Sequence, residues 1–216
     1  VSLKVESIGR DCDMSLARAV TLLSDSEKRK AAEFQFPFLQ KRYVRGRGML
    51  RRHLSNKLWQ NPSKIQIAET ETGKPYLSEH DVAFNVSHSE ELFVVAIADG
   101  AESVGVDIEL LDREIDFMGV AAHNFTPGEC AELAAAGEWR TRLLFFQIWT
   151  AKEALMKYTG EGFGIDPGAI DIQFYDHKPV GFLTEEYAHL YLQTIMLKEG
   201  EAVCSVVSEE PFELSI

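Results

Sequence analysis

Two acidic residues stand one position apart in an otherwise apolar run, Val104-Gly-Val-Asp-Ile-Glu-Leu110. Side chains alternate along a β-strand, so Asp107 and Glu109 are expected to face the same side of it. Unpaired charge on an apolar strand is costly, which predicts a cation between the two carboxylates. A third acid, Glu153, lies in the helical run Trp149-Thr-Ala-Lys-Glu-Ala-Leu-Met-Lys157. Three carboxylates, completed by phosphate and water oxygens, suit an octahedral Mg²⁺.

These acids also have a purely structural interpretation. Glu153 and Lys157 are spaced i, i+4 on a helix and could form a surface ion pair, which contributes only about 0.3–0.5 kcal/mol. Asp107 and Glu109 could belong to a turn at a strand end, or could protect a strand edge. Taken one at a time, the motifs leave both interpretations open.

A second polar cluster follows a strand-like run in Phe84-Asn-Val-Ser-His-Ser89. Adjacent residues on a strand point apart, so Ser87 and His88 are not placed to act as nucleophile and base. The chain also lacks a Gly-x-Ser-x-Gly nucleophile elbow. The functional interpretation is that Ser87 and His88 donate hydrogen bonds to a phosphate. The structural one is that Asn85 and Ser87 satisfy backbone groups in a turn.

Charge is unevenly distributed along the chain. The net charge is −12, from 22 basic and 34 acidic residues, which argues against general nucleic-acid binding. Residues 28–52, here called the basic segment, contain many Lys and Arg residues and one acid, Glu33. Such a segment is either the solvated face of a helix or a site for an anionic ligand.

The bulk composition is that of an ordinary globular protein, with 45% hydrophobic and 26% charged residues in 216. No apolar run approaches the roughly 20 residues that span a bilayer, and no signal peptide is recognisable. Three widely spaced cysteines form neither a disulfide framework nor a zinc motif. We therefore expect a cytoplasmic protein without membrane or nucleic-acid partners.

The pattern of predicted elements is helices followed by antiparallel strands, and it occurs twice. A capping box at Ser24 predicts a helix to residue 34, and a second helix is expected over 41–59. Further helices are expected from Thr126, which is followed by a proline, and over about 140–158. Strands are expected at 3–8, 65–68, 82–86, 92–98, 103–110, 169–174, 190–197 and 202–207. This predicts an α+β fold of two similar halves, 1–112 and 113–216.

The two central motifs together resemble a known family. Gly105-Val-Asp-Ile-Glu109, followed by Trp149-Thr-Ala-Lys-Glu-Ala-x-x-Lys157, is similar to the signature pair of 4′-phosphopantetheinyl transferases. The run 84–89, Gly73-Lys-Pro75 and Arg42-Tyr-Val-x-x-Arg47-x-x-Leu-Arg51 resemble the surfactin-synthetase-activator (Sfp) type. The resemblance covers roughly residues 24–164. It implies a pseudo-twofold arrangement of the two halves, with the active site in the cleft between them, and a monomer.

The resemblance also implies an activity: Mg²⁺-dependent transfer of 4′-phosphopantetheine from coenzyme A to a serine of an apo acyl or peptidyl carrier protein. Its metal ligands would be Asp107, Glu109 and Glu153. The proton of the serine would go to Glu129, Glu153 or a metal-bound water. Glu129 could instead complete a capping box with Thr126.

Contacts to coenzyme A are implied in the same way. The nucleotide end would meet Lys28, Arg47 and Lys74, the 3′-phosphate and pyrophosphate would meet Ser87 and His88, and the pyrophosphate would meet Lys152 and Lys157. Outward residues of the basic segment would attract the acidic recognition helix of a carrier protein. Two rival functions remain: a metal-dependent phosphohydrolase acting on coenzyme A or a nucleotide, and a non-enzymatic module that binds coenzyme A or a carrier protein.

Overall fold

The structure, a computed structural model, describes residues 1–9 and 12–216 and divides them into two compact units. Unit 1 comprises Val1–Lys4, Ala68–Glu90 and Val94–Ile216, and unit 2 comprises Val5–Ile67 and Glu91–Phe93. These units are defined by packing within the chain. The predicted division into two similar halves at residue 112 is a different description, and it stays a prediction.

Unit 2 is built around three helices, α1 (Leu16–Leu22), α2 (Asp25–Ala32) and α3 (Pro37–Leu58). The predicted capping box is present: the Ser24 hydroxyl accepts from the backbone of Glu27, whose side chain accepts from Ser24. Helix α3 begins earlier than predicted because Pro37, at its first turn, needs no hydrogen-bond acceptor for a backbone N–H. The seven-residue α1 was not predicted.

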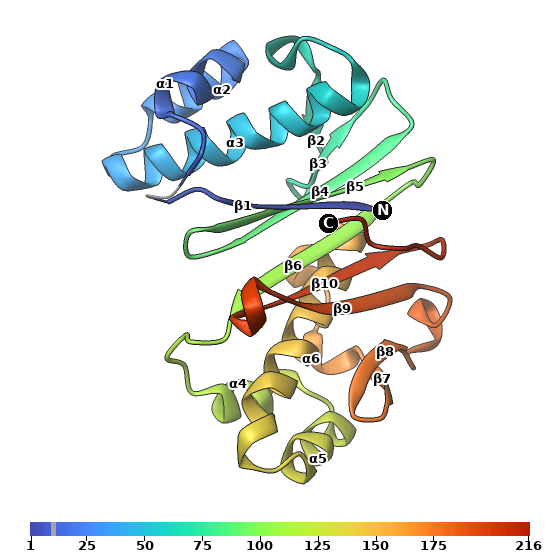
Figure 1. Cartoon of the computed structure of the whole chain (residues 1–216). Coiled ribbons are helices and arrows are strands. Elements are labelled where there is room, and N and C mark those ends of the chain that lie inside the picture. Colours follow the sequence, from blue (N-terminus) through green and yellow to red (C-terminus); the bar gives the residue numbers. More distant parts are fainter. Residues whose placement is uncertain (10–11) are drawn as a thin grey trace. The chain divides into compact units, whose positions relative to one another are not determined.

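The chain forms two three-stranded sheets (Figure 1). One has the order β1 (Ser2–Ser7), β5 (Leu92–Asp99) and β4 (Val82–Ser89), with the ends of β1 and β5 assigned to unit 2. The other has the order β6 (Val104–Leu110), β10 (Ala202–Ser208) and β9 (Tyr191–Leu197). Strand β10 runs antiparallel to both neighbours, with Ser205 opposite Asp107 of β6 and Thr194 of β9.

Two short strand pairs complete the sheets, β2 (Ile67–Glu69) with β3 (Pro75–Leu77) and β7 (Ile172–Tyr175) with β8 (Lys178–Phe182). Neither β3 nor β8 was predicted, because short strands that contain proline give little alternation to detect. Strand β4 runs three residues beyond its predicted end, so Ser87 and His88 lie within the strand rather than at its tip.

Three helices belong to unit 1: α4 (Phe117–Asn124), α5 (Pro127–Ala135) and α6 (Glu138–Thr159). Helix α6 packs against β6 and β10 (Figure 1). Its buried side chains Phe145, Ile148 and Leu155 contribute to the core. The contact with β6 is so close that a Cβ at Gly105 would lie 1.9 Å from the carbonyl oxygen of Ala154. Glycine at this position therefore allows the backbones of α6 and β6 to approach.

The α+β class predicted from the sequence is confirmed, since runs of helices and runs of strands follow one another along the chain and the pairings of β10 with β6 and β9 are antiparallel. Within the described part of the chain, none of the helices combines the length and apolarity required of a membrane span.

Candidate functional site

The acids of the two central motifs line one cavity of about 350 Å³ in unit 1. Strand β6 contributes Asp107 and Glu109, and helix α6 contributes Glu153. The apolar part of the cavity lining includes aromatic side chains of the same helix, Phe146 and Trp149 among them. The cavity thus takes its lining from residues on both sides of the predicted boundary at residue 112.

Asp107 is buried, with 5% of its surface exposed, and only one of its carboxylate oxygens is satisfied. Its Oδ1 accepts from Ser87 Oγ and from Lys157 Nζ, each at 2.7 Å. Its Oδ2 is buried and has no hydrogen-bond partner. A buried carboxylate oxygen without a partner carries a large desolvation cost, which a bound cation would remove.

Glu109 is held in a comparable way. Its Oε2 accepts from Ser89 Oγ at 2.6 Å and from an Arg113 guanidinium N–H at 2.7 Å. Neither Ser89 nor Arg113 was predicted as a site residue. The alternation of Asn85, Ser87 and Ser89 along one strand was the available signal for Ser89, because residues i and i+2 share a face.

The charges of Asp107 and Glu109 both act on the carboxyl group of Glu153. Burial raises the pKa of its carboxyl, the negative charges of Asp107 and Glu109 raise this pKa further, and Lys157 opposes the shift. Three carboxylates that line one cavity, together with the unpartnered Asp107 Oδ2, fit the hard oxygen ligands that Mg²⁺ prefers. Over residues 1–9 and 12–216, however, there is no group of three or more His, Cys, Asp or Glu side chains arranged so that it could hold a metal ion. The magnesium site stays a prediction.

Two cations belong to this site: Arg113 lines the cavity and pairs with Glu109, and Lys157 pairs with Asp107. The Nζ of Lys157 lies 2.8 Å from Ser87 Oγ as well as 2.7 Å from Asp107 Oδ1, and its side chain is 29% exposed. The i, i+4 interpretation of Lys157 as a surface partner of Glu153 is therefore not what the structure shows, because its ion pair is with Asp107 on β6.

Lys152 and Glu129, predicted to serve the pyrophosphate and the proton, pair with each other at 2.6 Å. Their side chains are 1% and 0% exposed, and neither lines the cavity. Lys152 also donates to backbone carbonyl oxygens of Asn124, Pro167 and Ile170. Burial raises the pKa of Glu129 and lowers that of Lys152, and their mutual attraction opposes both shifts. In the structure both residues therefore have a structural role, and their contacts to the pyrophosphate and the serine proton stay predictions.

Glu129 instead has the structural role that the sequence left open. Its carboxylate accepts from the backbone N–H groups of Thr126 and Ile172, and the Thr126 hydroxyl accepts from the N–H of Glu129. The capping box of α5 is therefore complete, and it also anchors the start of β7.

Lys74 and His88 lie in unit 1 but outside the acidic cavity. The Lys74 ammonium donates to Ser103 Oγ and to the Tyr158 carbonyl oxygen, both at 2.6 Å, and burial lowers its pKa to about 8. Lys74 also lines a separate cavity of about 180 Å³. His88 is exposed on β4.

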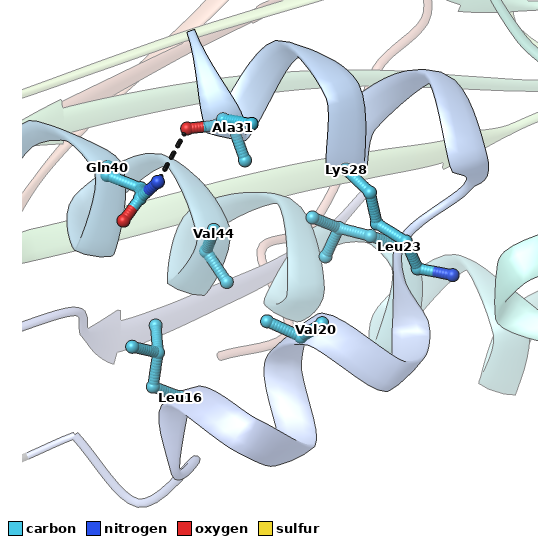
Figure 2. Close-up of a pocket in the computed structure, with 8 residues that line it drawn as sticks. Leu16, Val20, Leu23, Lys28, Ala31, Gln40 and Val44 are labelled. Atoms are coloured by element: carbon cyan, nitrogen blue, oxygen red, sulfur yellow. Dashed lines mark hydrogen bonds between the residues drawn. The ribbon is translucent and has the colours of Figure 1, made fainter. Parts of the chain in front are cut away.

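Lys28 and Arg47 belong to unit 2, where both have acidic partners. Lys28 pairs with Asp25 at 3.2 Å and lies beside an apolar cavity of about 220 Å³ formed with Leu23 and Val44 (Figure 2). Arg47 pairs at 2.7 Å with the buried Glu27, which also pairs with Arg51. Their contacts to coenzyme A stay predictions.

Many basic side chains of the basic segment therefore already have partners within the protein, which the sequence alone did not indicate. Arg52 pairs with Glu6 and Asp13, and Arg45 donates to the backbone carbonyl oxygens of Ile8 and Gly9. The acids that pair with Arg47, Arg51 and Arg52 all precede residue 28, so a count confined to the segment missed them. Several of its charges therefore stabilise unit 2 itself.

Two family models match the chain almost end to end. The model described as 4′-phosphopantetheinyl transferase superfamily matches residues 103–207, and the model described as 4′-phosphopantetheinyl transferase, N-terminal, matches residues 10–100. The first match contains Asp107, Glu109, Glu153 and Lys157.

Individual relatives agree with the models. The 4′-phosphopantetheinyl transferase HetI of Nostoc sp. is 35% identical over 148 residues, which cover 67% of this chain and 62% of that protein. The enzyme psf-1 of Bacillus pumilus is 37% identical over 139 residues, which cover 63% of this chain and 58% of that protein. The chain thus spans less than two thirds of either relative.

A longer match at lower identity is to the 4′-phosphopantetheinyl transferase Sfp of Bacillus subtilis, 23% identical over 203 residues that cover 92% of this chain and 89% of that protein. A holo-(acyl-carrier-protein) synthase structure from Bacillus anthracis covers 50% of this chain and 94% of its own, with a TM-score of 0.41 and 20% identity, a likeness too weak to support a conclusion. On the two family models and these relatives, the chain belongs to the 4′-phosphopantetheinyl transferase superfamily.

Proposed function

We propose that this protein transfers 4′-phosphopantetheine from coenzyme A to a serine hydroxyl of an apo carrier protein, with Mg²⁺ held by Asp107, Glu109 and Glu153. The observation that carries the proposal is the half-satisfied carboxylate of Asp107. Its Oδ1 is fixed by Ser87 and Lys157, while its buried Oδ2 has no partner beside a cavity that Glu109 and Glu153 also line.

The reaction is a transfer at phosphorus. The serine oxygen forms a bond to the β-phosphorus of coenzyme A, the bond from that phosphorus to the bridging oxygen breaks, and adenosine 3′,5′-bisphosphate leaves. Catalysis of such a step depends mainly on positioning and on stabilising charge. When bound, Mg²⁺ would neutralise charge on the pyrophosphate and its leaving group.

Lys157 supplies fixed positive charge from the protein. Its Nζ is held by Asp107 and Ser87, yet its side chain keeps 29% of its surface exposed, so a phosphate oxygen could reach it. A charge held in place before the reaction needs no reorganisation as negative charge develops on the leaving group.

The serine proton needs an acceptor. Glu153 lines the same cavity as Asp107 and Glu109. Glu129 is fully buried and engaged with Lys152. These contacts favour Glu153 over Glu129 as the protein group that accepts the proton.

The test is to incubate the protein with coenzyme A, Mg²⁺ and several apo carrier proteins, and to follow each carrier by intact-mass spectrometry. We expect the mass of one phosphopantetheine to be added, at a rate that Asp107→Asn lowers by roughly a hundredfold or more. Chromatography of the nucleotides without a carrier separates the rivals. A phosphohydrolase would release adenosine 3′,5′-bisphosphate there, and a binding module would release none under any condition; either result would overturn the proposal.

A further inference from the structure

Three polar side chains at alternate positions of β4 face β6, although the two strands belong to different sheets. Asn85, Ser87 and Ser89 are all buried, with 4%, 7% and 4% of their surfaces exposed. Asn85 Oδ1 accepts from the backbone N–H of Val106 at 3.1 Å. The two serines, here called the serine pair, form hydrogen bonds with the two acids of β6, Asp107 and Glu109.

The direction of each serine hydrogen bond is fixed by its second partner. Lys157 can only donate, so Ser87 Oγ accepts from it and gives its single hydrogen to Asp107 Oδ1. Ser89 Oγ accepts from the N–H of Leu110 at 3.2 Å and gives its hydrogen to Glu109 Oε2. Each hydroxyl thus accepts one N–H and donates to one carboxylate.

The serine pair consequently restrains one oxygen of each acid. A carboxylate held through one oxygen cannot rotate freely about its terminal torsion, and its second oxygen then has a defined position. For Asp107 that second oxygen is the buried, unpartnered Oδ2. Metal ligands are commonly oriented in this way by hydrogen bonds from residues that do not touch the metal.

We propose that Ser87 and Ser89 are positioning residues that set Asp107 and Glu109 for a common divalent cation. The inference rests on the proposed function, since it presumes the magnesium site. It differs from what the resemblance implies for Ser87, namely direct contact with phosphate. In the structure, the Ser87 hydroxyl would have to leave Asp107 to donate to a phosphate, which would leave a buried carboxylate with one donor fewer.

The experiment measures Mn²⁺ binding directly, by electron paramagnetic resonance of free Mn²⁺ titrated with the full chain. Ser87→Ala and Ser89→Ala are each expected to weaken Mn²⁺ binding by roughly tenfold or more, the usual effect of removing a group that orients a ligand. Affinity for coenzyme A measured in chelator should be unchanged in both variants.

Ser205→Ala is the matched control. Ser205 is fully buried and lies opposite Asp107 in the neighbouring strand, but its hydroxyl bonds Thr150 and Thr194 rather than a carboxylate. Its loss should leave Mn²⁺ affinity at the wild-type value. Circular dichroism melts of all three variants verify folding, and Ser89→Ala carries the test if Ser87→Ala does not fold.

Two outcomes would overturn the inference, and they differ. If Ser87→Ala and Ser89→Ala bind Mn²⁺ like wild type while Ser87→Ala loses coenzyme A affinity in chelator, Ser87 serves the phosphate, and the proposed function stands. If wild type binds no Mn²⁺, or Asp107→Asn binds it equally well, the metal site itself fails, and the positioning role falls with it. The carrier mass assay reports on transfer independently of both.

Discussion

Two lysines five positions apart on α6 each pair with a carboxylate at nearly the same distance, yet their surroundings differ. Lys152 lies 2.6 Å from Glu129, with side-chain exposures of 1% and 0%, and every partner it has belongs to the protein interior. Lys157 lies 2.7 Å from Asp107, is 29% exposed, and leaves Asp107 Oδ2 without a partner. The first pair is complete and the second is not.

The surroundings of Lys152 and Lys157 distinguish a charge that stabilises the fold from one that could bind a ligand, which the sequence motif alone does not do. A buried ion pair whose donors and acceptors are all satisfied gains nothing from a ligand. A pair that leaves a buried oxygen unsatisfied beside a cavity is stabilised by whatever cation or donor completes it. Both lysines occur in one sequence motif, and only their neighbours distinguish them.

The largest expected effect is at the incomplete pair. Asp107→Asn keeps the side-chain shape but removes the negative charge, so transfer to a carrier protein should fall by roughly a hundredfold or more. The carrier mass assay measures the loss, and circular dichroism should show a wild-type fold. Transfer at more than about a tenth of the wild-type rate would remove Asp107 from the mechanism.

The complete pair should respond in stability rather than in transfer. Lys152→Met leaves Glu129 as a buried unpaired charge, which costs about 3–5 kcal/mol when one partner of such a pair is lost. Urea unfolding measures the cost. Transfer per folded molecule should stay within about threefold of wild type. A stable but inactive Lys152→Met would mean that Lys152 contacts the substrate after all.

Lys157→Met is the matched exchange on the same helix. Because the Lys157 side chain is partly exposed and Asp107 keeps its hydrogen bond from Ser87, the free energy of unfolding should fall by less than it does in Lys152→Met. Transfer should fall by about tenfold to a hundredfold, because a fixed positive charge near the reacting phosphate is lost. Equal stability losses for Lys152→Met and Lys157→Met would contradict the distinction drawn between the two pairs.

A smaller effect should appear when metal is removed. In chelator, Glu153→Gln relieves the crowding of Glu153 with Asp107 and Glu109, so the variant should melt a few degrees above wild type. Excess Mg²⁺ should stabilise wild type by binding its folded state and leave the variant nearly unchanged. Differential scanning fluorimetry with and without Mg²⁺ measures the melting temperatures of both proteins. If Mg²⁺ raised the two melting temperatures equally, this would argue against a site that uses Glu153.

The smallest effect concerns Lys74, a third lysine that contacts α6 through the Tyr158 carbonyl oxygen. Burial lowers its pKa to about 8, so between about pH 8 and pH 10.5 the unfolded chain holds the proton that the folded chain has released. The free energy of unfolding should therefore rise with pH across that window. Lys74→Met should lack this rise, as urea midpoints at about pH 7 and pH 9.5 would show; identical pH dependence in both proteins would contradict it.

Local patterns along the chain predicted a good part of this fold. The alternation around Asp107 and Glu109 gave β6, and the capping boxes at Ser24 and Thr126 gave the starts of two helices. Such features are visible because a few adjacent residues determine them. Helices α1 and α4 were missed because seven or eight residues carry too little periodicity.

The partners of charged residues were harder to predict, because they depend on contacts between distant segments. Nothing adjacent to Arg51 indicates that Glu27 will bury against it, and nothing near Lys152 indicates Glu129. The motif therefore identified which residue types matter on α6, while the fold decided which of them face the cavity. Ser89 shows the same limit, since its value depends on a strand twenty residues away.

The junction between β4 and β6 is made by the side chains of Asn85, Ser87 and Ser89, which take the place that backbone groups occupy within a sheet. Backbone ladders are nearly indifferent to side-chain identity, so evolution can adjust them only indirectly. Because this junction depends on three side chains, a single substitution can weaken or strengthen it. The same three positions would also be the first places to reinforce in an engineered, heat-resistant variant.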